Sequence, residues 1–208
     1  MRIGGFVKNS LVDWEGKVAA VIFTKGCNFR CGYCHNPSLV LPELMNKTED
    51  IAEKTVLDFL AERNTWLDGV VVTGGEPTIH RDLPVFLEDI KLLGYPVKLD
   101  TNGTNPFMLQ KIIKNKLADY IAMDVKILPE KSLYGKITGI QVTADIIEKI
   151  MTSILLLNNT ATEVEFRTTI IPGIHDEAAI ELIHTLLGNN KKYRTNQYRN
   201  GSTIETYL

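Results

Sequence analysis

Short apolar stretches rich in β-branched residues recur along the chain, and stretches with the apolar spacing of a helix lie between them. The strand-like stretches are residues 18–24, 69–73, 96–100, 120–125 and 163–171. Runs of this length and composition are typical of strands buried on both faces of a parallel sheet. Apolar residues three and four positions apart predict helices at residues 83–93, 106–116 and 146–157, and two more that open at Thr48 and at a cap on Asp176.

The alternation of strand and helix indicates an α/β fold. Units of this kind join parallel strands by right-handed crossovers, and their ligand sites lie at the C-terminal ends of the strands. Four polar segments follow predicted strands: a cysteine loop at residues 24–36, Gly74-Gly75-Glu76, Asp100-Thr101-Asn102 and Asp124-Val125-Lys126. We therefore expect these four segments to face one another.

The length of the chain favours a single domain. With 208 residues and 44% hydrophobic composition, it can bury one sizeable core. We predict one domain over residues 1–208, with an N-terminal extension at residues 1–17 and a polar tail at residues 188–208. The tail could be a short edge strand or a mobile flap.

Charge and hydropathy limit which partners and which cellular compartment we expect. The chain has 23 Lys and Arg against 25 Asp and Glu, a net charge of -2, so no overall field attracts nucleic acid or an anionic membrane. The first residues lack an apolar signal region, and the apolar runs are too short to span a bilayer. We expect a cytoplasmic protein that binds neither nucleic acid nor membrane, and a reducing compartment suits closely spaced cysteines.

All three cysteines lie in the cysteine loop, as Cys27, Cys31 and Cys34. Thiolates at this CxxxCxxC spacing converge on a soft metal centre, and iron-sulfur clusters are bound by cysteine sulfur. Three ligands to a four-iron cluster would leave one iron open to a substrate. The alternatives are a structural zinc site with His35 as fourth ligand, and three buried thiols. Zinc sites usually draw on two separated pairs of ligands, so the cluster is favoured.

Further motifs resemble a known family. Tyr33 precedes the last cysteine, and Gly-Gly-Glu-Pro stands at residues 74–77, at a strand end. This combination resembles the radical S-adenosylmethionine (SAM) superfamily. The Cys-His-Asn-Pro run at residues 34–37 and the Asp-Thr-Asn-Gly run at residues 100–103 are similar to the glycyl-radical-enzyme activating proteins. Residues 5–13 and the compact size are most similar to the activating proteins of anaerobic ribonucleoside-triphosphate reductase.

The resemblance implies a fold, two cofactors and a set of site residues. The implied fold is a partial (β/α)6 TIM-like barrel of the radical SAM type. Cys27, Cys31 and Cys34 would hold a 4Fe-4S cluster, and the amino and carboxylate groups of SAM would chelate the open iron. The implied cofactor-binding residues are Tyr33, His35, Gly74, Gly75, Glu76, Asp100, Asn102, Asp124 and Lys126.

The resemblance also implies a reaction and partners. A radical SAM oxidoreductase of this type cleaves SAM reductively to methionine and a 5′-deoxyadenosyl radical, which takes a hydrogen atom from a glycine of a partner enzyme. The implied partner is an anaerobic ribonucleoside-triphosphate reductase, and a flavodoxin-like protein would supply the electron. The alternatives are a radical SAM enzyme acting on a small molecule, such as a 7-carboxy-7-deazaguanine synthase, and a non-catalytic zinc-binding module.

Several charged residues also have a purely structural interpretation. Asp124 and Lys126 could form a surface ion pair, which would contribute little to stability. Arg167, in the middle of a predicted strand, could pair with Glu163 or Glu165. The histidines without a cysteine neighbour, expected in turns or on helix surfaces, are His80, His175 and His184.

Overall fold

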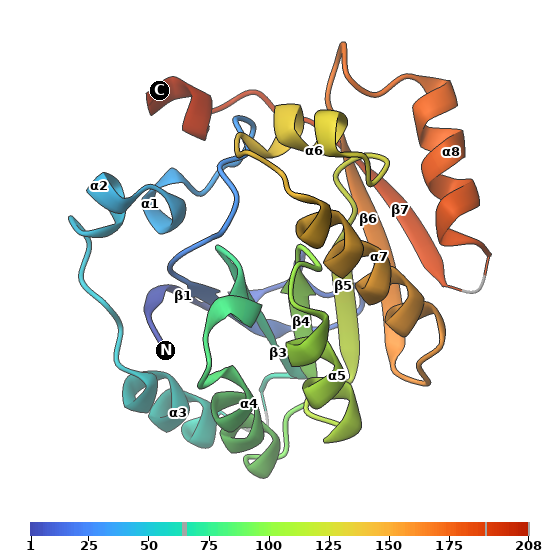
Figure 1. Cartoon of the computed structure of the whole chain (residues 1–208). Helices are drawn as coiled ribbons and strands as arrows, with labels where there is room; N and C mark the ends of the chain where they lie inside the picture. The colour runs from blue at the N-terminus through green and yellow to red at the C-terminus, as the bar shows by residue number, and fades with distance from the viewer. Residues whose placement is uncertain (64–65, 190, 208) are drawn as a thin grey trace.

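The computed structural model describes residues 1–63, 66–189 and 191–207, and within them the strands form one seven-stranded sheet (Figure 1). The strands are β1 (Ile3–Ser10), β2 (Ala19–Thr24), β3 (Gly69–Gly74), β4 (Val97–Thr101), β5 (Tyr120–Asp124), β6 (Glu163–Ile170) and β7 (Lys192–Gln197). They lie in the sheet in chain order, with β2 to β7 parallel and β1 antiparallel to β2. β1 and β7 form the edges of an open sheet, as in a partial barrel.

Helices connect the parallel strands and cover one face of the sheet. The longer ones are α3 (Glu53–Glu62), α4 (Leu83–Leu92), α5 (Pro106–Lys114), α7 (Ala144–Asn158) and α8 (Glu177–Leu187). The shorter ones are α1 (Pro37–Val40), α2 (Pro42–Met45), α6 (Lys131–Thr138) and the 3-10 helices η1 (Pro77–Ile79) and η2 (Ile204–Tyr207). In Figure 1, α4, α5 and α7 lie on the same side of strands β3 to β5. In the described part of the chain, no helix combines the length and apolar character needed to cross a membrane.

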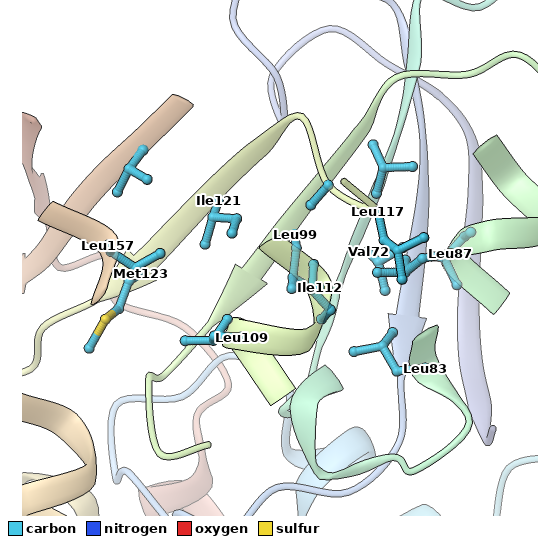
Figure 2. Close-up of a cluster of buried hydrophobic side chains, with 14 of the residues drawn as sticks. Val72, Leu83, Leu87, Leu99, Leu109, Ile112, Leu117, Ile121, Met123 and Leu157 are labelled. Carbon is cyan, nitrogen blue, oxygen red and sulfur yellow. The ribbon is translucent and has the colours of Figure 1, made fainter. Parts of the chain in front are cut away.

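The main core lies between these helices and the outer face of the sheet. Alternate residues of each strand point to it, because side chains alternate between the two faces of a sheet. Val72 on β3, Leu99 on β4 and Ile121 on β5 are fully buried in this core. Figure 2 shows part of it, with Val72, Leu83, Leu87, Leu99, Leu109, Ile112, Leu117, Ile121, Met123 and Leu157 labelled.

A smaller apolar cluster lies on the inner face of the sheet, at the N-terminal ends of the strands. Trp14 packs there against Tyr120, with 5.9 Å between ring centroids. Gly69, the first residue of β3, makes room for the indole, because a Cβ at this position would lie 2.8 Å from the ring. Trp14 therefore closes the end of the barrel opposite the C-terminal strand ends.

The α/β fold class predicted from the sequence is confirmed, and the five predicted strands correspond to β2 to β6. The predicted N-terminal extension contains strand β1, which the sequence pattern did not indicate. Two glycines, Gly4 and Gly5, lie within β1, and Ile3 and Ser10 are the buried residues at its ends. A strand with so few buried side chains shows no apolar run.

The helix predicted to open at Thr48 begins later, at Glu53. Residues 48–52 are not helical, because contacts with other parts of the chain hold this segment. The buried ammonium of Lys25 donates to the carbonyl oxygen of Thr48 at 2.5 Å and to the carboxylate of Asp50 at 2.6 Å. Ile51 pairs with the start of β1. These tertiary contacts override the local helix signal.

The predicted polar tail contains the edge strand β7, so the edge-strand alternative is confirmed for residues 192–197. Asn190 and Leu208, which belong to the predicted tail, lie outside the described residues. After β7 the chain crosses the C-terminal ends of the strands and ends in η2. Figure 1 shows η2, beside the C-terminus, close to α1.

Candidate active site

A cavity of about 260 Å³ lies at the C-terminal ends of the parallel strands. The four polar segments that follow predicted strands meet there, as expected from the strand-end rule. The cavity lining includes all predicted site residues: Cys27, Cys31, Cys34, Tyr33, His35, Gly74, Gly75, Glu76, Asp100, Asn102, Asp124 and Lys126. Their individual roles toward cofactors stay predictions.

The three cysteines are free thiols, and Cys31 is the most deeply buried. The backbone N–H of Phe29 donates to the Cys27 sulfur at 3.4 Å, and that of Asn36 to the Cys34 sulfur at 3.5 Å. Burial, with a smaller contribution from the Glu76 carboxyl, raises the pKa of Cys27 to about 12. Burial likewise raises the pKa of Cys31. These thiols therefore stay protonated until a metal displaces the proton.

The three thiols line one cavity. Within the described residues, no three His, Cys, Asp or Glu side chains are grouped to hold one metal ion. An iron-sulfur cluster takes its cysteine ligands at different irons, so the sulfurs need only line the same cavity. The lining of the cavity by Cys27, Cys31 and Cys34 meets this requirement.

Glycines let the end of β3 approach the cysteine loop. Gly74 has a φ of +112°, and a Cβ there would lie 2.4 Å from the backbone nitrogen of Thr24. The N–H of Gly75 donates to the carbonyl oxygen of Thr24 at 2.9 Å, and the N–H of Glu76 donates to that of Gly26 at 2.8 Å. Backbone atoms thus form this wall of the cavity, which leaves space for a ligand to approach closely.

Glu76 is 1% exposed and binds neighbouring loops together. Its Oε1 accepts from the Thr101 hydroxyl at 2.8 Å and from the N–H and hydroxyl of Thr78, and its Oε2 accepts from the N–H of Asn102 at 2.6 Å. The Asn102 amide in turn donates to Asn28 of the cysteine loop at 2.8 Å. Burial raises the pKa of Glu76 although all these donors oppose the shift. Glu76 therefore joins the ends of β3 and β4, while the Asn102 side chain joins β4 to the cysteine loop.

Four charged side chains form a network on the wall of the cavity. Lys126 Nζ lies 2.9 Å from the Asp124 carboxylate, and Arg167 Nε lies 2.9 Å from its other oxygen. Arg167 also reaches Asp100, at 3.3 Å. Arg167 thus pairs with Asp124 and Asp100 and lines the cavity, so of the two alternatives for Arg167 the structure has the one that reaches the site rather than a pair with Glu163 or Glu165.

The network fixes the charge state of its members. Burial alone would raise the pKa of Asp124, but Arg167 and Lys126 outweigh it and lower this pKa to about 2. Burial would lower the pKa of Lys126, yet Asp124, with smaller contributions from Tyr33 and Cys31, raises it well above its ordinary value. The Lys126 side chain is 14% exposed, so the expectation of a purely surface ion pair is not met. A permanent cation therefore lines the cavity.

One acceptor in the network is left over. Asp100 Oδ1 is buried and has no hydrogen-bond partner among the described residues, and Lys98 Nζ lies 3.9 Å away from it. A buried carboxylate oxygen without a donor is costly and is ordinarily satisfied by water or a ligand. Asp100 lines the cavity, so a bound hydroxyl or ammonium group can supply that donor.

The histidines lie in different surroundings. His35 is exposed and stacks on Tyr198, with 6.1 Å between the ring centroids. His175 is buried, which corrects the expectation of a surface turn: its Nδ1 accepts from Ile171 N–H and its Nε2 donates to the carbonyl oxygen of Lys126. His184 is exposed on α8, as expected.

Residues that the sequence analysis did not assign to the site also line the cavity, among them Arg167 and Ile204. Glu163, Glu165 and Arg167 alternate along β6 with Val164 and Phe166, which belong to the main core. This alternation is the signal that places all three on the inner face of the sheet. For Ile204, in a polar tail, no comparable signal exists.

A second cavity, of about 330 Å³, continues below the first inside the curved sheet, and Asp100 and Arg167 line both. Its walls carry charges of both signs, including Lys98, Glu165 and Arg194. Glu165 Oε1 is buried and lies 3.1 Å from Arg194 Nε. The interior of the sheet is thus polar from the strand ends down to the Trp14 cluster.

Comparison with known proteins agrees with this geometry. Residues 21–186 match the model of the Radical SAM superfamily. The chain is 37% identical over 199 residues to "Putative glycyl-radical enzyme activating enzyme MJ1227" of Methanocaldococcus jannaschii, covering 94% of this chain and 79% of that protein. It is 29% identical over 176 residues to "Probable GTP 3',8-cyclase" of Pyrococcus abyssi, covering 83% of this chain and 55% of that protein.

Solved structures resemble the fold. SuiB of Streptococcus suis superposes with a TM-score of 0.67 at 16% identity, covering 88% of this chain and 40% of that one. The family match spans most of the sheet and the cysteine loop, and it favours an iron-sulfur cluster over zinc at that loop. From this match and the open α/β sheet it accompanies, the chain belongs to the radical SAM superfamily, whose enzymes use a 4Fe-4S cluster and SAM.

Proposed function

We propose that this protein activates a glycyl radical enzyme, and that the partner is an anaerobic ribonucleoside-triphosphate reductase. The observation that carries the proposal is one cavity lined by three free thiols and by the charged network of Asp124, Lys126 and Arg167. The similarity over 94% of this chain to a protein named as an activating enzyme supports the same assignment.

The donor set suits the cofactors of the family. Cys27, Cys31 and Cys34 would hold the cluster, because soft thiolates are the ligands that iron-sulfur clusters take. The absence of a fourth cysteine from the sequence leaves one iron for the substrate. The chemistry that these cofactors supply when bound is the reductive cleavage of SAM to methionine and a 5′-deoxyadenosyl radical.

The remaining walls suit the polar groups of SAM. Lys126 would face a carboxylate, since its raised pKa keeps it cationic at all relevant pH. Asp100 and Asp124 would accept from an ammonium or a ribose hydroxyl, and Asp100 Oδ1, which has no donor among the described residues, has the capacity to do so. The backbone at Gly74 and Gly75 would lie against the methionyl group, because no side chain intervenes there.

The reaction needs one partner that supplies an electron and a second that supplies a hydrogen atom. A flavodoxin-like donor would supply one electron for each SAM cleaved. The radical would take one hydrogen atom from the glycine α-carbon, which leaves 5′-deoxyadenosine and a glycyl radical stored on the reductase.

A second candidate is a radical SAM enzyme that acts on a small polar molecule, such as a 7-carboxy-7-deazaguanine synthase. The second cavity favours it, because buried charges of both signs suit a small polar substrate. The relative named as a GTP 3',8-cyclase also supports a small-molecule substrate, although this chain spans 55% of its length.

The deciding experiment separates SAM cleavage from radical transfer. The protein is reconstituted anaerobically with iron and sulfide, reduced, and supplied with SAM, and 5′-deoxyadenosine is measured by chromatography. The reaction is then repeated with the anaerobic reductase of the same organism, and the glycyl radical is detected by electron paramagnetic resonance. Cys31→Ala is the control for the cluster, and a reductase with its radical glycine changed to alanine is the control for the acceptor.

The proposal expects 5′-deoxyadenosine that depends on Cys31 and a radical that depends on the reductase glycine. Cleavage of SAM without a radical on the reductase would overturn the assignment of the partner and favour the small-molecule candidate. Zinc without iron or sulfide in protein purified anaerobically would overturn the cluster itself.

A further inference from the structure

The residues that follow β7 fold back over the cysteine loop. We call residues 198–207 the strap. At its start, the N–H of Tyr198 donates to the carbonyl oxygen of Ile170 at the end of β6, at 3.2 Å. The Tyr198 ring then stacks on His35 at an angle of 26° between the rings. A Cβ on Gly201 would lie 3.5 Å from the His35 ring, so the strap passes in contact with the cysteine loop.

Ile204 anchors the strap. Its side chain is 0% exposed and packs in an apolar cluster with Leu39, Val40 and Leu41, against which Cys27 and Cys34 also pack. Thr203 beside it is also buried, whereas the flanking residues 201–202 and 205–207 are exposed. A fully buried isoleucine in an otherwise polar segment indicates a specific docking contact, since removing its side chain from water favours the docked state.

Two backbone hydrogen bonds join the strap to the cluster-binding residues themselves. The N–H of Ile204 donates to the carbonyl oxygen of Cys34 at 3.0 Å, and the N–H of Glu205 donates to that of Gly32 at 2.9 Å. The N–H of Cys34 donates to Cys31 at 3.0 Å, which closes the turn between these two cysteines. The strap therefore holds both ends of the Gly32–Cys34 turn from outside, while Ile204 lines the cavity inside.

We propose that the strap is a positioning element of the cluster site. Ile204 and the two backbone bonds hold the Gly32–Cys34 turn in one conformation and cover the outer side of the cavity next to Cys34. Figure 1 shows the end of the strap lying beside α1, apart from α3, α4, α5 and α7. The strap can therefore detach without disturbing the core, and its contacts act on the turn specifically. This inference rests on the proposed cluster at Cys27, Cys31 and Cys34.

The test uses Ile204→Asp, with Leu182→Asp as the matched control. Both changes place an acid at an apolar position, but Leu182 is 54% exposed on α8 and lines neither cavity. After anaerobic reconstitution, the rate of iron release to a chelator is followed by absorbance. We expect release at least about tenfold faster from Ile204→Asp, because a buried acid strongly favours the open strap, and an unchanged rate from the control.

Two further readouts separate positioning from global stability. In the metal-free protein, hydrogen exchange of residues 31–36 should be faster in Ile204→Asp, while exchange in β3 to β5 is unchanged. In the loaded protein, the resonance spectrum of the reduced cluster should change its line shape, which a purely global effect would not produce. Ile204→Ala leaves a cavity instead of a buried acid, so it should change iron release, exchange and line shape in the same direction by a smaller amount. These measurements on Ile204→Ala test the proposal if the aspartate variant does not fold.

The outcomes distinguish a failure of the proposed cluster from a failure of the proposed role of the strap. Parent protein that binds no iron would overturn the proposed cluster, and exchange of residues 31–36 in the metal-free variants would still test the strap. Parent protein that holds the cluster, with release rates and exchange in Ile204→Asp and Ile204→Ala equal to those of the parent, would overturn the strap alone.

Discussion

Gly75 and Gly26 are in direct contact through their backbones: a Cβ built on Gly75 would lie 1.9 Å from the carbonyl oxygen of Gly26. The neighbouring N–H of Glu76 donates to the same oxygen. The end of β3 can therefore touch the cysteine loop only if residue 75 has no side chain.

Gly75→Ala should destabilise the protein by about 3 kcal/mol, because the conflicting atom is backbone and cannot rotate away. It should also weaken SAM binding, since the wall of the cavity must shift. The free energy of unfolding in urea and the affinity for SAM check these two effects. Gly135→Ala in α6 is the control: its Cβ would meet a single atom at 3.4 Å, so we expect no loss. Equal effects of the two substitutions would contradict the contact.

Glu76→Gln should cost about 1 to 3 kcal/mol, because an amide has one acceptor oxygen and would turn its NH₂ group toward a buried donor. The buried donors are the N–H of Asn102 and the groups of Thr78 and Thr101. Urea unfolding of the metal-free protein gives the difference. The exposed Glu88→Gln is the matched control and should change stability by less than about 0.5 kcal/mol. A Glu76 variant as stable as the parent would show that these bonds contribute nothing.

Asp124 should make stability depend on pH in acid. Its pKa in the folded protein is about 2, below the ordinary value of 3.8, so the folded state favours the carboxylate. The stabilisation is fully present above the ordinary pKa and is lost as the pH falls through about 2. The difference in unfolding free energy between the parent and Asp124→Asn should therefore shrink between pH 6 and pH 2.5.

The control for this titration is Asp58→Asn, which removes a largely exposed carboxylate paired with Lys54. Surface pairs of this kind contribute little, so its difference from the parent should stay small throughout. A gap between parent and Asp124→Asn that stays constant or widens in acid would show that Arg167 and Lys126 do not stabilise the charged form.

The two tryptophans should differ strongly in their contribution to stability. Trp14 is 7% exposed and packs against Tyr120 and Gly69, whereas Trp66 is 75% exposed. Trp14→Ala should cost about 3 to 5 kcal/mol, because it leaves a cavity at the closed end of the barrel. Trp66→Ala should change the free energy of unfolding by less than about 0.5 kcal/mol. Similar losses for the two variants would mean that Trp14 does not close the barrel.

The central strands could be predicted because burial on both faces makes their sequences continuously apolar. β1 could not, because Ile3 alone carries its apolar burial and glycines follow. The start of α3 was misplaced because the signal at Thr48 is local, whereas the ammonium of Lys25 that holds this segment comes from a distant part of the chain.

The site could be predicted as far as it follows from topology. Residues at the C-terminal ends of parallel strands must meet, so Gly75, Asp100 and Asp124 came together without any knowledge of contacts. Arg167 and Ile204 reach the cavity from the middle of a strand and from a polar tail. The alternation along β6 indicates that Arg167 faces the inside of the sheet, but its pairing with Asp100 and Asp124 depends on the neighbouring strands. The position of Ile204 depends on a long-range docking contact, which local sequence does not encode.

The strand order has a consequence for biosynthesis. Each strand pairs with the one made just before it, so the sheet can grow at one edge as the chain leaves the ribosome. The cysteine loop is made early, Arg167 much later, and Ile204 later still. The thiols of the nascent protein are therefore accessible before the residues that complete the cavity have been synthesised. We expect metal to be delivered most easily in this period, which ends when Ile204 docks.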